Sequence, residues 1–375
     1  MFDELSDQVF EATHIRLSVT TLKRFFEVVE YRGMPSITTL DTLAKYVGRS
    51  NWREFKLESY SSKKLRPPYK TIYVAIGFAM ALLIVFIIGN KRPDIQVNAS
   101  DFSFSSQPLS TEYPNTVVFN FDIPDNLPTD SLHIQQYWDV TKTIRIDKTQ
   151  KQATGIYYFP GYFRAKLMVE GEPALEHDLF LKSNGWLGTI NYQPIPKYFI
   201  PIPAESFGLS LPQEIVTEVK RSENPISTTF HFIDNLGNVP ADHFSLSTII
   251  QNVFDDRWAV CQSFQIYIIG TKGAMIIPFS KKGCSSDLNL MLNDVYLSGK
   301  EHDLSALSAD FSSPVSLRLE VKDQGMIIHI HEKEVYRQAY NDSMGKLVGL
   351  RYRFQSPGKV ISMLLKDQKG QEVRL

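Results

Sequence analysis

The sequence predicts a multidomain chain with a small all-α N-terminal region, one transmembrane helix and two all-β antiparallel sandwich domains. Three observations predict this fold class. Near the start, apolar residues recur at the spacing of amphipathic helices. Residues 71–89 form one uncharged apolar stretch, and from about residue 112 onward apolar and polar residues alternate as in half-buried strands. With 375 residues, 43% of them hydrophobic, the chain is long enough to fill two or three cores.

Residues 1–60 are expected to fold as short helices. In LSVTTLKRFFEVVEY the apolar positions follow i, i+3, i+4, i+7 spacing, and Ser18 stands ahead of them as an N-cap. After a turn at RGMPS, either Ser36 or Thr39 caps the next helix, and a glycine ends it before a third helix begins. The residues expected to face inward are Leu22, Phe25, Phe26, Val29, Leu40, Leu43, Ala44, Val47, Trp52 and Phe55.

Two short helices joined at a glycine form a helix-turn-helix pattern. The stretch LDTLAKYVGRSNWREF resembles the helix-turn-helix of arabinose-activator-type transcription regulators, which implies that outward side chains of its second helix face DNA. The preceding helix presents further polar side chains in a similar way. The candidate DNA-binding residues are Thr20, Thr21, Lys23, Arg24, Arg49, Ser50, Asn51, Arg53 and Lys56. Because residues 1–70 carry a net charge of only +3, docking on a cytosolic protein is the alternative.

The apolar stretch at 71–89 contains nineteen residues without a charge, a proline or an amide. A helix of this length spans about 28 Å, close to the apolar thickness of a lipid bilayer, so we expect a single-pass anchor. Basic residues before the stretch outnumber those after it by four to two, which predicts a cytosolic N-terminus in the inner (cytoplasmic) membrane. The four residues, which lie in a basic linker at 61–70, are Lys63, Lys64, Arg66 and Lys70. The rest of the chain is then expected to be periplasmic or otherwise extracytoplasmic.

The first sandwich is expected at residues 95–190. In YYFPGYFRAKLMVEG, a Pro-Gly turn precedes a strand that alternates apolar and charged residues. Together with TVVFNFDI, IQQYWDVTKTIRI and EHDLFLKS, this stretch resembles the polycystic-kidney-disease (PKD) domain, a small β-sandwich, over residues 112–182. The acidic DFGDG turn of that family is replaced here by a short stretch at Trp138 and Asp139. The resemblance therefore implies a fold and no calcium or ligand role.

The second sandwich is expected at residues 205–375, after a proline-rich linker at 191–204 that is too rich in proline for a helix or a central strand. The stretches VSLRLEVKD and MIIHIHEKEVY alternate strictly and are separated by a tight turn. Followed by GLRYRF and KVISMLL, they resemble the final hairpins of concanavalin-like (laminin-G-like) jelly rolls over about 150 residues.

Both cysteines, Cys261 and Cys284, lie in the part expected to be exported, where disulfides form. They flank two strand-like stretches joined at TKG. If Lys272 and Gly273 form the turn, the cysteines lie directly opposite each other and a disulfide is expected. A turn one residue earlier places Lys282 opposite Cys261 instead, so two registers remain open at this point.

The sequence holds no recognisable catalytic motif. Phosphate-binding GxxxxGK, nucleophilic GxSxG and cysteine-rich metal spacings are absent, and no ExDxE-like run suggests the glycoside hydrolases found among such jelly rolls. His329 and His331 share one face of an expected strand, as a metal pair does and as ordinary solvent-facing residues also do. We expect no enzyme activity, no metal and no cofactor.

The predicted layout indicates a membrane-anchored signalling or transcription-regulatory protein. Its exported sandwiches would sense a ligand such as a carbohydrate or an envelope polymer, its head would bind DNA or a cytosolic protein, and a homodimer would couple the two sides. The alternative is an envelope adhesion or scaffold protein that binds glycan or protein partners without DNA binding. The formal net charge of −1 excludes a uniformly basic nucleic-acid coat protein.

Overall fold

A computed structural model describes residues 1–29, 33, 35–59, 98–137, 139–204 and 208–375. The chain divides into two compact units, Met1–Asp94 and Ile95–Leu375. The described residues of the first unit include the helices α1 (Phe2–Thr13), α2 (Val19–Phe25), α3 (Ile37–Tyr46) and α4 (Trp52–Ser59).

The fold class expected from the sequence needs correction. The described residues are mostly β-sheet, and none of their helices is long and apolar enough to cross a membrane. Helix α1 is the longest of them at 12 residues, so it extends about 18 Å, well short of an apolar bilayer thickness of about 30 Å. The expected span at 71–89 and the basic residues at 63, 64, 66 and 70 lie outside the described residues.

In the first unit the predicted caps are confirmed. Ser18 Oγ accepts from the Thr21 amide at 3.1 Å, and Ser36, rather than Thr39, caps α3 in the same way at 3.2 Å. Helix α2 ends earlier than expected, because Glu27 adopts a left-handed conformation (φ 58°) and the Val28 amide bonds back to the Lys23 carbonyl. The apolar residues beyond this end are therefore exposed. The buried core consists of Val9, Leu17, Leu22 and Leu43.

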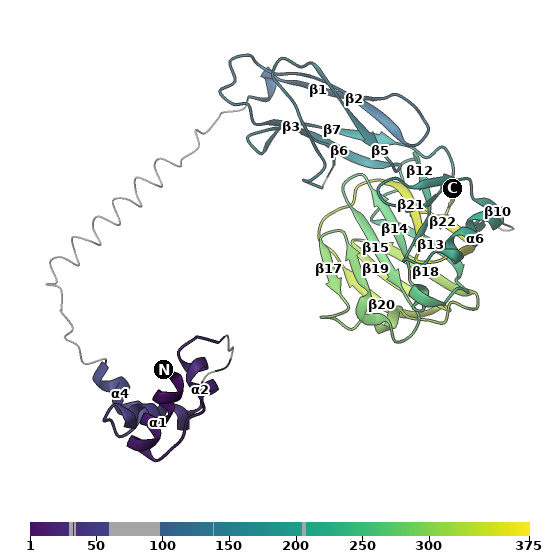
Figure 1. Ribbon diagram of the computed structural model, residues 1–375. Helices are drawn as coiled ribbons and strands as arrows, with labels where there is room; N and C mark the ends of the chain where they lie inside the picture. Colours follow the sequence, from purple (N-terminus) through teal and green to yellow (C-terminus); the bar gives the residue numbers. More distant parts are fainter. Residues whose placement is uncertain (30–32, 34, 60–97, 138, 205–207) are drawn as a thin grey trace. The chain divides into compact units, whose positions relative to one another are not determined.

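The second unit begins with a small sandwich of two antiparallel sheets, seen in Figure 1. One sheet has the order β1-β2-β5, from β1 (Ser103–Pro108), β2 (Asn115–Asp122) and β5 (Gln152–Tyr157). The other has the order β4-β3-β6-β7, from β3 (Leu132–Gln135), β4 (Thr143–Arg145), β6 (Gly161–Val169) and β7 (Glu172–Leu181). A core shared by both sheets includes Phe119 and Leu167, both fully buried.

Two eight-stranded antiparallel sheets form the larger sandwich that follows. The β14 sheet has the order β17-β16-β15-β14-β21-β12-β8-β9. Its strands are β8 (Leu187–Ile190), β9 (Lys197–Phe199), β12 (Thr228–Ile233), β14 (Phe264–Gly270), β15 (Ala274–Phe279), β16 (Asn289–Leu292), β17 (Val295–Ser298) and β21 (Leu347–Phe354).

The opposing β13 sheet has the order β10-β11-β22-β13-β18-β19-β20, with β23 paired to β22. Its strands are β10 (Ile202–Ala204), β11 (Gly208–Ser210), β13 (His243–Gln251), β18 (Val315–Lys322), β19 (Gly325–Ile330), β20 (Lys333–Ala339), β22 (Lys359–Lys366) and β23 (Glu372–Val373). Helix α6 (Gln213–Arg221) and four short 3-10 turns, Ala99–Asp101, Arg257–Ala259, Ser285–Asp287 and Ser305–Leu307, complete the described elements of the unit.

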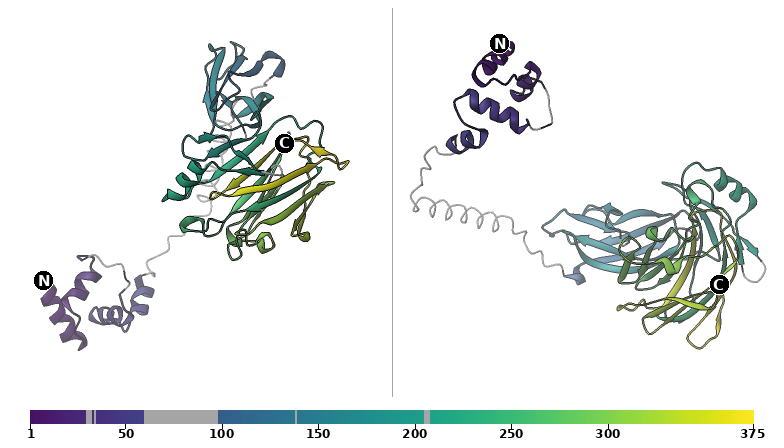
Figure 2. Two further views of the ribbon diagram at one scale, coloured as in Figure 1. Left: turned by 90° about the vertical axis from the view of Figure 1, so that its right-hand side faces the viewer. Right: turned by 90° about the horizontal axis from the view of Figure 1, so that it is seen from below.

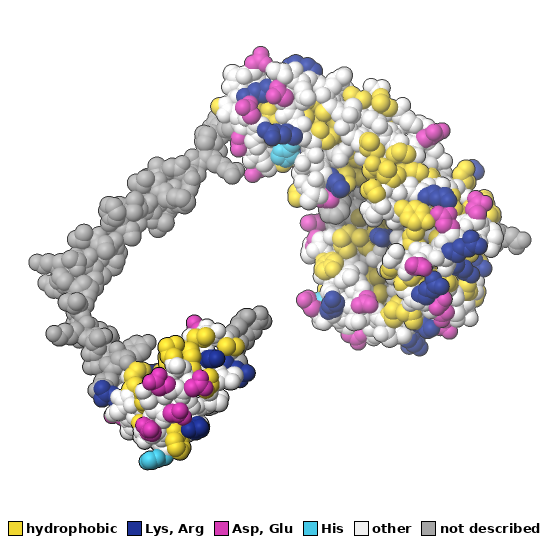
Figure 3. Space-filling model, in the orientation of Figure 1, with side chains coloured by type: hydrophobic (Ala, Val, Ile, Leu, Met, Phe, Trp, Pro, Cys, Tyr) yellow, Lys and Arg dark blue, Asp and Glu magenta, His cyan; other side chains and the backbone are white. Residues whose placement is uncertain are grey.

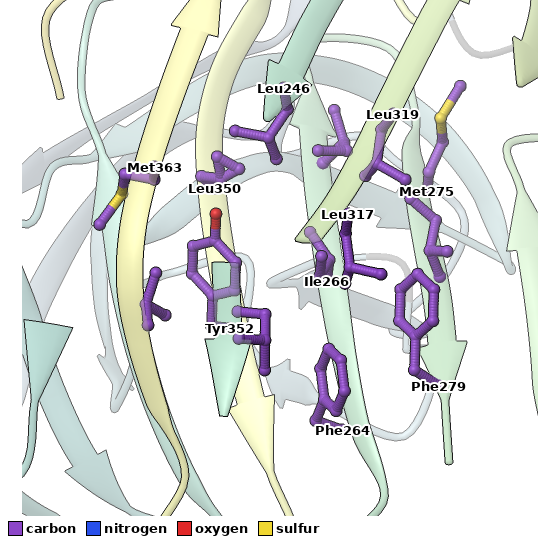
Figure 4. Close-up of a cluster of buried hydrophobic side chains, with 14 of the residues drawn as sticks. Leu246, Phe264, Ile266, Met275, Phe279, Leu317, Leu319, Leu350, Tyr352 and Met363 are labelled. Carbon is purple, nitrogen blue, oxygen red and sulfur yellow. The ribbon is translucent and has the colours of Figure 1, made fainter. Parts of the chain in front are cut away.

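Alternate side chains of both sheets fill the space between them. Figure 4 shows Leu246, Leu317 and Leu319 of the β13 sheet facing the β14 sheet, whose contributions include Phe264, Ile266 and Tyr352. Strand β18 displays the pattern clearly, since its residues alternate between buried and half-buried along its first seven positions. The alternation that the sequence predicts for VSLRLEVKD is confirmed, and so is a β-sandwich in this region.

The expected linker at 191–204 takes part in the sheets instead. Strand β9 is the outer strand of the β14 sheet, and β10 is the outer strand of the β13 sheet. Pro203 lies in β10, and an edge strand tolerates proline because one side of it makes no ladder hydrogen bonds. Strand β8, expected in the first sandwich, pairs with β12 in the larger one.

The disulfide between Cys261 and Cys284 is present, with an Sγ–Sγ distance of 2.04 Å. The register expected to bring these residues together is wrong, because Phe264 pairs with Phe279 and the hairpin turn lies one residue earlier. Both cysteines lie beyond the paired strands, where the Lys281 amide donates to the Cys261 carbonyl at 2.8 Å. The chain outside the ladder therefore brings the two sulfur atoms together without direct cross-strand pairing.

A polar cluster joins the two sandwiches of the second unit. Arg351 on β21 donates to the Pro160 carbonyl, and the Phe159 ring stacks on the buried His231 of β12 at 5.6 Å. Tyr198 donates to the Tyr158 carbonyl at 2.9 Å. Burial, reinforced by two neighbouring guanidinium groups, holds the pKa of His231 well below its ordinary value.

This pKa shift predicts that the protein loses stability in mild acid. Below about pH 6.5 the unfolded chain binds a proton at His231 that the folded chain does not, so the free energy of unfolding falls as pH falls, by at most about 1.4 kcal/mol per pH unit. Urea unfolding between about pH 5 and pH 8 measures this slope. We expect His231→Asn to reduce it and substitution of the exposed His302 to leave it unchanged; an unaltered slope in the first variant would refute the assignment.

Candidate functional site

The outer face of the β13 sheet carries a shallow groove of about 420 Å³. Three neighbouring strands, β22, β13 and β18, form its floor. The turn between β19 and β20 and the short strand β23 supply one residue each. The lining residues are Ser247, Thr248, Ile249, Ser316, Leu317, Arg318, Glu332, Ser362, Met363, Leu364 and Glu372. We refer to this feature as the serine groove.

Strand register explains how the groove is assembled. Ser247 lies opposite Arg318 on one neighbouring strand and opposite Leu364 on the other. Two positions along, Ile249 lies between Ser316 and Ser362. These side chains share one face because alternate residues of a strand point the same way, while their neighbours in sequence fill the core. The groove is thus two rows of side chains across three strands.

The serines of the groove are available to a ligand. Ser247, Ser316 and Ser362 are half-buried, and their hydroxyl groups have no hydrogen-bond partner within the described parts of the chain. A serine hydroxyl both donates and accepts a hydrogen bond. The floor therefore presents three groups that can pair with ligand hydroxyls of either orientation, next to two aliphatic side chains.

Arg318 is held in place by two carboxylates. Its Nη1 lies 2.9 Å from Glu320 Oε1, and its Nη2 lies 3.4 Å from Glu332 Oε2. Its Nε is buried and has no partner among the described residues. A guanidinium fixed in this way keeps a defined orientation, and its remaining N–H groups can donate to oxygen atoms of a ligand.

The β19–β20 hairpin positions Glu332 over the groove. Ile330 pairs with Lys333, so His331 and Glu332 form a two-residue turn, and both have positive φ angles of 49° and 63°. The nearby carboxylate of Glu334 on β20 pairs with Arg337 and not with Arg318. Arg337 donates hydrogen bonds to Glu334 and thereby lowers the pKa of that carboxyl group. The turn brings a single carboxylate to Arg318.

The histidine pair considered from the sequence does not share a strand face. His329 lies on β19 opposite Arg318, whereas His331 lies in the turn and is exposed. No group of three or more metal-ligating side chains occurs within the described residues. Strand β19 ends at Ile330, one residue before His331, because the two-residue turn begins at His331.

The candidate DNA-binding residues lie on α2, in the turn after α3, and on α4. Two of them have structural roles: Asn51 Oδ1 accepts from the Glu54 amide at 3.0 Å, and Glu54 accepts from the Ser50 amide at 2.8 Å. Hydrogen bonds from the Ser50 hydroxyl and the Ser50 amide to its carboxylate lower the pKa of Glu54. Arg53 and Lys56 are exposed, while Thr21 forms part of the Ser18 cap. DNA contact by this set stays a prediction.

Sequence reasoning missed one Ser–His pair as well as the groove. Ser106 Oγ lies 2.6 Å from His177 Nε2, and the Phe104 ring packs against the imidazole at 4.6 Å. Burial lowers the pKa of His177. Its Nδ1 is buried without a partner in the described structure, so no carboxylate orients the ring as in a catalytic triad. The two residues lie 71 positions apart, and no local pattern connects them.

No protein-family model matches the chain, and no curated protein matches it in sequence. Solved structures resemble part of it. Chicken galectin 2 is 15% identical, covers 36% of this chain and 96% of its own, with a TM-score of 0.27. Domain 4 of an extracellular arabinanase from Geobacillus stearothermophilus, solved with arabinotriose, is 7% identical. It covers 50% of this chain and 84% of its own, with a TM-score of 0.30. An alginate lyase from a Corynebacterium species is 7% identical. It covers 48% of this chain and 93% of its own, with a TM-score of 0.28.

The β-sandwich expected for the concanavalin-like region is present in the two facing sheets described above. The resemblance to PKD domains stays a prediction, although residues 103–181 do form a sandwich. Nothing in the described residues adds support to the resemblance between the N-terminal unit and transcription regulators.

Proposed function

We propose that the larger sandwich binds carbohydrate through the serine groove and that the protein serves as an adhesion or scaffold protein. The observation that carries this proposal is the set of three serine hydroxyls, in two adjacent rows and without a partner among the described residues, beside an oriented guanidinium. This alternative has more support than the function expected first, that of a membrane-anchored, DNA-binding signalling protein. The described residues provide no support for membrane anchoring, DNA binding or signalling.

The chemistry of the groove matches that of a carbohydrate. A saccharide presents many hydroxyl groups at short spacing, and both serine and arginine side chains hydrogen-bond such groups. Ile249 and Leu364 offer aliphatic surface for the C–H groups of a sugar ring. No aromatic side chain lines the groove among the described residues, so hydrogen bonds rather than ring stacking would provide the affinity.

The disulfide supports an extracytoplasmic location for the second unit. Disulfides persist in oxidising compartments and are rare in the reducing cytosol. The Cys261–Cys284 bond therefore fits a protein that meets glycans outside the cytoplasm. This location stays part of the proposal.

We propose binding without catalysis. Glycoside hydrolysis needs a carboxylic acid and a second carboxylate that are both available to the scissile bond. Of the two carboxylates among the described lining residues, Glu332 is paired with Arg318 at 3.4 Å, which leaves Glu372 without a second available carboxylate. A hydrolase remains the rival function, and release of reducing sugar from a bound glycan would favour it.

The proposal predicts that Arg318→Ala weakens glycan binding by about tenfold to a hundredfold, because a hydrogen bond from a charged donor contributes about 1.5–3 kcal/mol. Binding of the full-length chain to an array of oligosaccharides identifies a ligand, and calorimetry then measures its affinity. Ser316→Ala should give a smaller loss. Ser245→Ala is the matched control, since Ser245 lies on the same face of β13 but outside the groove. Absence of glycan binding by the unmodified protein, or equal affinity in Arg318→Ala, would refute the proposal.

A further inference from the structure

The charges around the serine groove restrict which saccharides it can accept. Among the described residues that line it, Arg318 is the one cationic side chain, whereas Glu332 and Glu372 contribute two carboxylates. A third carboxylate, Glu320, pairs with the same guanidinium from β18. The described lining is therefore negative overall, even though it contains an arginine.

Arg318 is not free to act as the counterion of an acidic ligand. Its two terminal nitrogen atoms already face Glu320 and Glu332. A ligand carboxylate that approached Arg318 would have to displace Glu332 or lie beside it, and like charges at such short range repel in a partly desolvated site. Uncharged hydroxyl groups encounter no such penalty, because they can donate to the carboxylate and accept from the guanidinium.

We infer that the groove selects uncharged saccharides and excludes those bearing carboxylate or sulfate groups, with Glu332 as the residue that sets this selection. The inference rests on the proposed function and names the ligand class of the same site. Its basis is the juxtaposition of one guanidinium paired with Glu320 and Glu332, one further lining carboxylate, Glu372, and three neutral hydroxyl groups that can donate and accept. Specificity of this kind arises from a repulsive group as much as from attractive contacts.

Glu332 is suited to testing this role without disturbing the fold. Its side chain is 76% exposed and lies at the tip of the β19–β20 turn. Glutamine at this position keeps the size and hydrogen-bonding capacity of the side chain while removing its charge. Glu334→Gln provides the matched control. Glu334 lies two residues after Glu332, pairs with Arg337 and does not line the groove.

The experiment compares saccharides that differ only in charge: dextran against dextran sulfate, and oligogalacturonate against the same oligomer after reduction of its carboxyl groups. The full-length protein should bind the neutral member of at least one pair about tenfold or more tighter than the acidic member at low salt. Glu332→Gln should narrow this ratio by about tenfold, mainly through better binding of the acidic member, and Glu334→Gln should leave it unchanged.

The outcomes separate this inference from the proposed function. If the unmodified protein binds the acidic member equally well or better, and Arg318→Ala abolishes that binding, the groove binds saccharide but the charge selection is wrong. If Glu332→Gln leaves the ratio unaltered, Glu332 does not set the selection. If neither saccharide pair binds and the array shows no other glycan, both the proposed function and the inference are overturned.

Discussion

Phe264→Ala should lower the free energy of unfolding of the second unit by about 3–5 kcal/mol. Phe264 is the first residue of β14, a central strand of its sheet, and is 1% exposed. Its ring packs against Phe279 at 5.1 Å, Phe311 at 4.7 Å and Phe354 at 5.4 Å. Removing the ring costs both the transfer of apolar surface from water and the contacts of three aromatic partners, because a close-packed core closes such a cavity only partly.

Urea or guanidinium unfolding followed by tryptophan fluorescence measures this loss, because Trp186 packs against Phe232 and the aromatic Tyr352 of the same core. Val253→Ala is the control, since Val253 is 56% exposed and exposed substitutions change stability by less than about 0.5 kcal/mol. Phe264→Leu should fall between the two. A loss below about 1 kcal/mol for Phe264→Ala would mean that the aromatic cluster is not packed as described.

Removal of the disulfide should have the second-largest effect. Cys261 and Cys284 are 23 residues apart, and closing a loop of this length restricts the unfolded chain by about 3 kcal/mol in the chain-entropy model. We therefore expect the double variant Cys261→Ser, Cys284→Ser to unfold at a clearly lower urea concentration than the parent protein, with its fold retained.

A reductant supplies the internal control for this prediction. Adding it to the unmodified protein should reproduce the lower unfolding midpoint, whereas the double variant should not respond. If the parent protein yields two free thiols by mass spectrometry before any reduction, or if its midpoint does not change with reductant, the bond does not stabilise the sandwich.

Local features were the part of this fold that sequence reasoning could predict. Ser18 and Ser36 cap helices because an N-cap depends on only four consecutive residues. The faces of β18 follow from strict alternation over eight residues. The end of α2 was missed because a non-glycine residue, Glu27, adopts the left-handed conformation that glycine usually signals.

Features that depend on distant parts of the chain were not predictable in the same way. The serine groove joins Ser247, Ser316 and Ser362, which span more than a hundred positions and meet only through the order of three strands. The proline-rich stretch gave no sign that its two strands would lie at sheet edges. The disulfide between Cys261 and Cys284 was predicted correctly, but from an incorrect hairpin register. The cysteines meet because the loops beyond the paired strands, and not the strand pairing itself, bring them together.

The alternation of β13, β18 and β22 has a consequence for how such a protein can diversify. Each strand supports the interior with one set of positions and presents a second set on the outer face of the sheet, so substitutions in the second set leave the packing of the first intact. New recognition properties could therefore arise, by natural variation or in a randomised library at 247, 249, 316, 318, 362 and 364, on a scaffold whose integrity does not depend on the choice made at those sites.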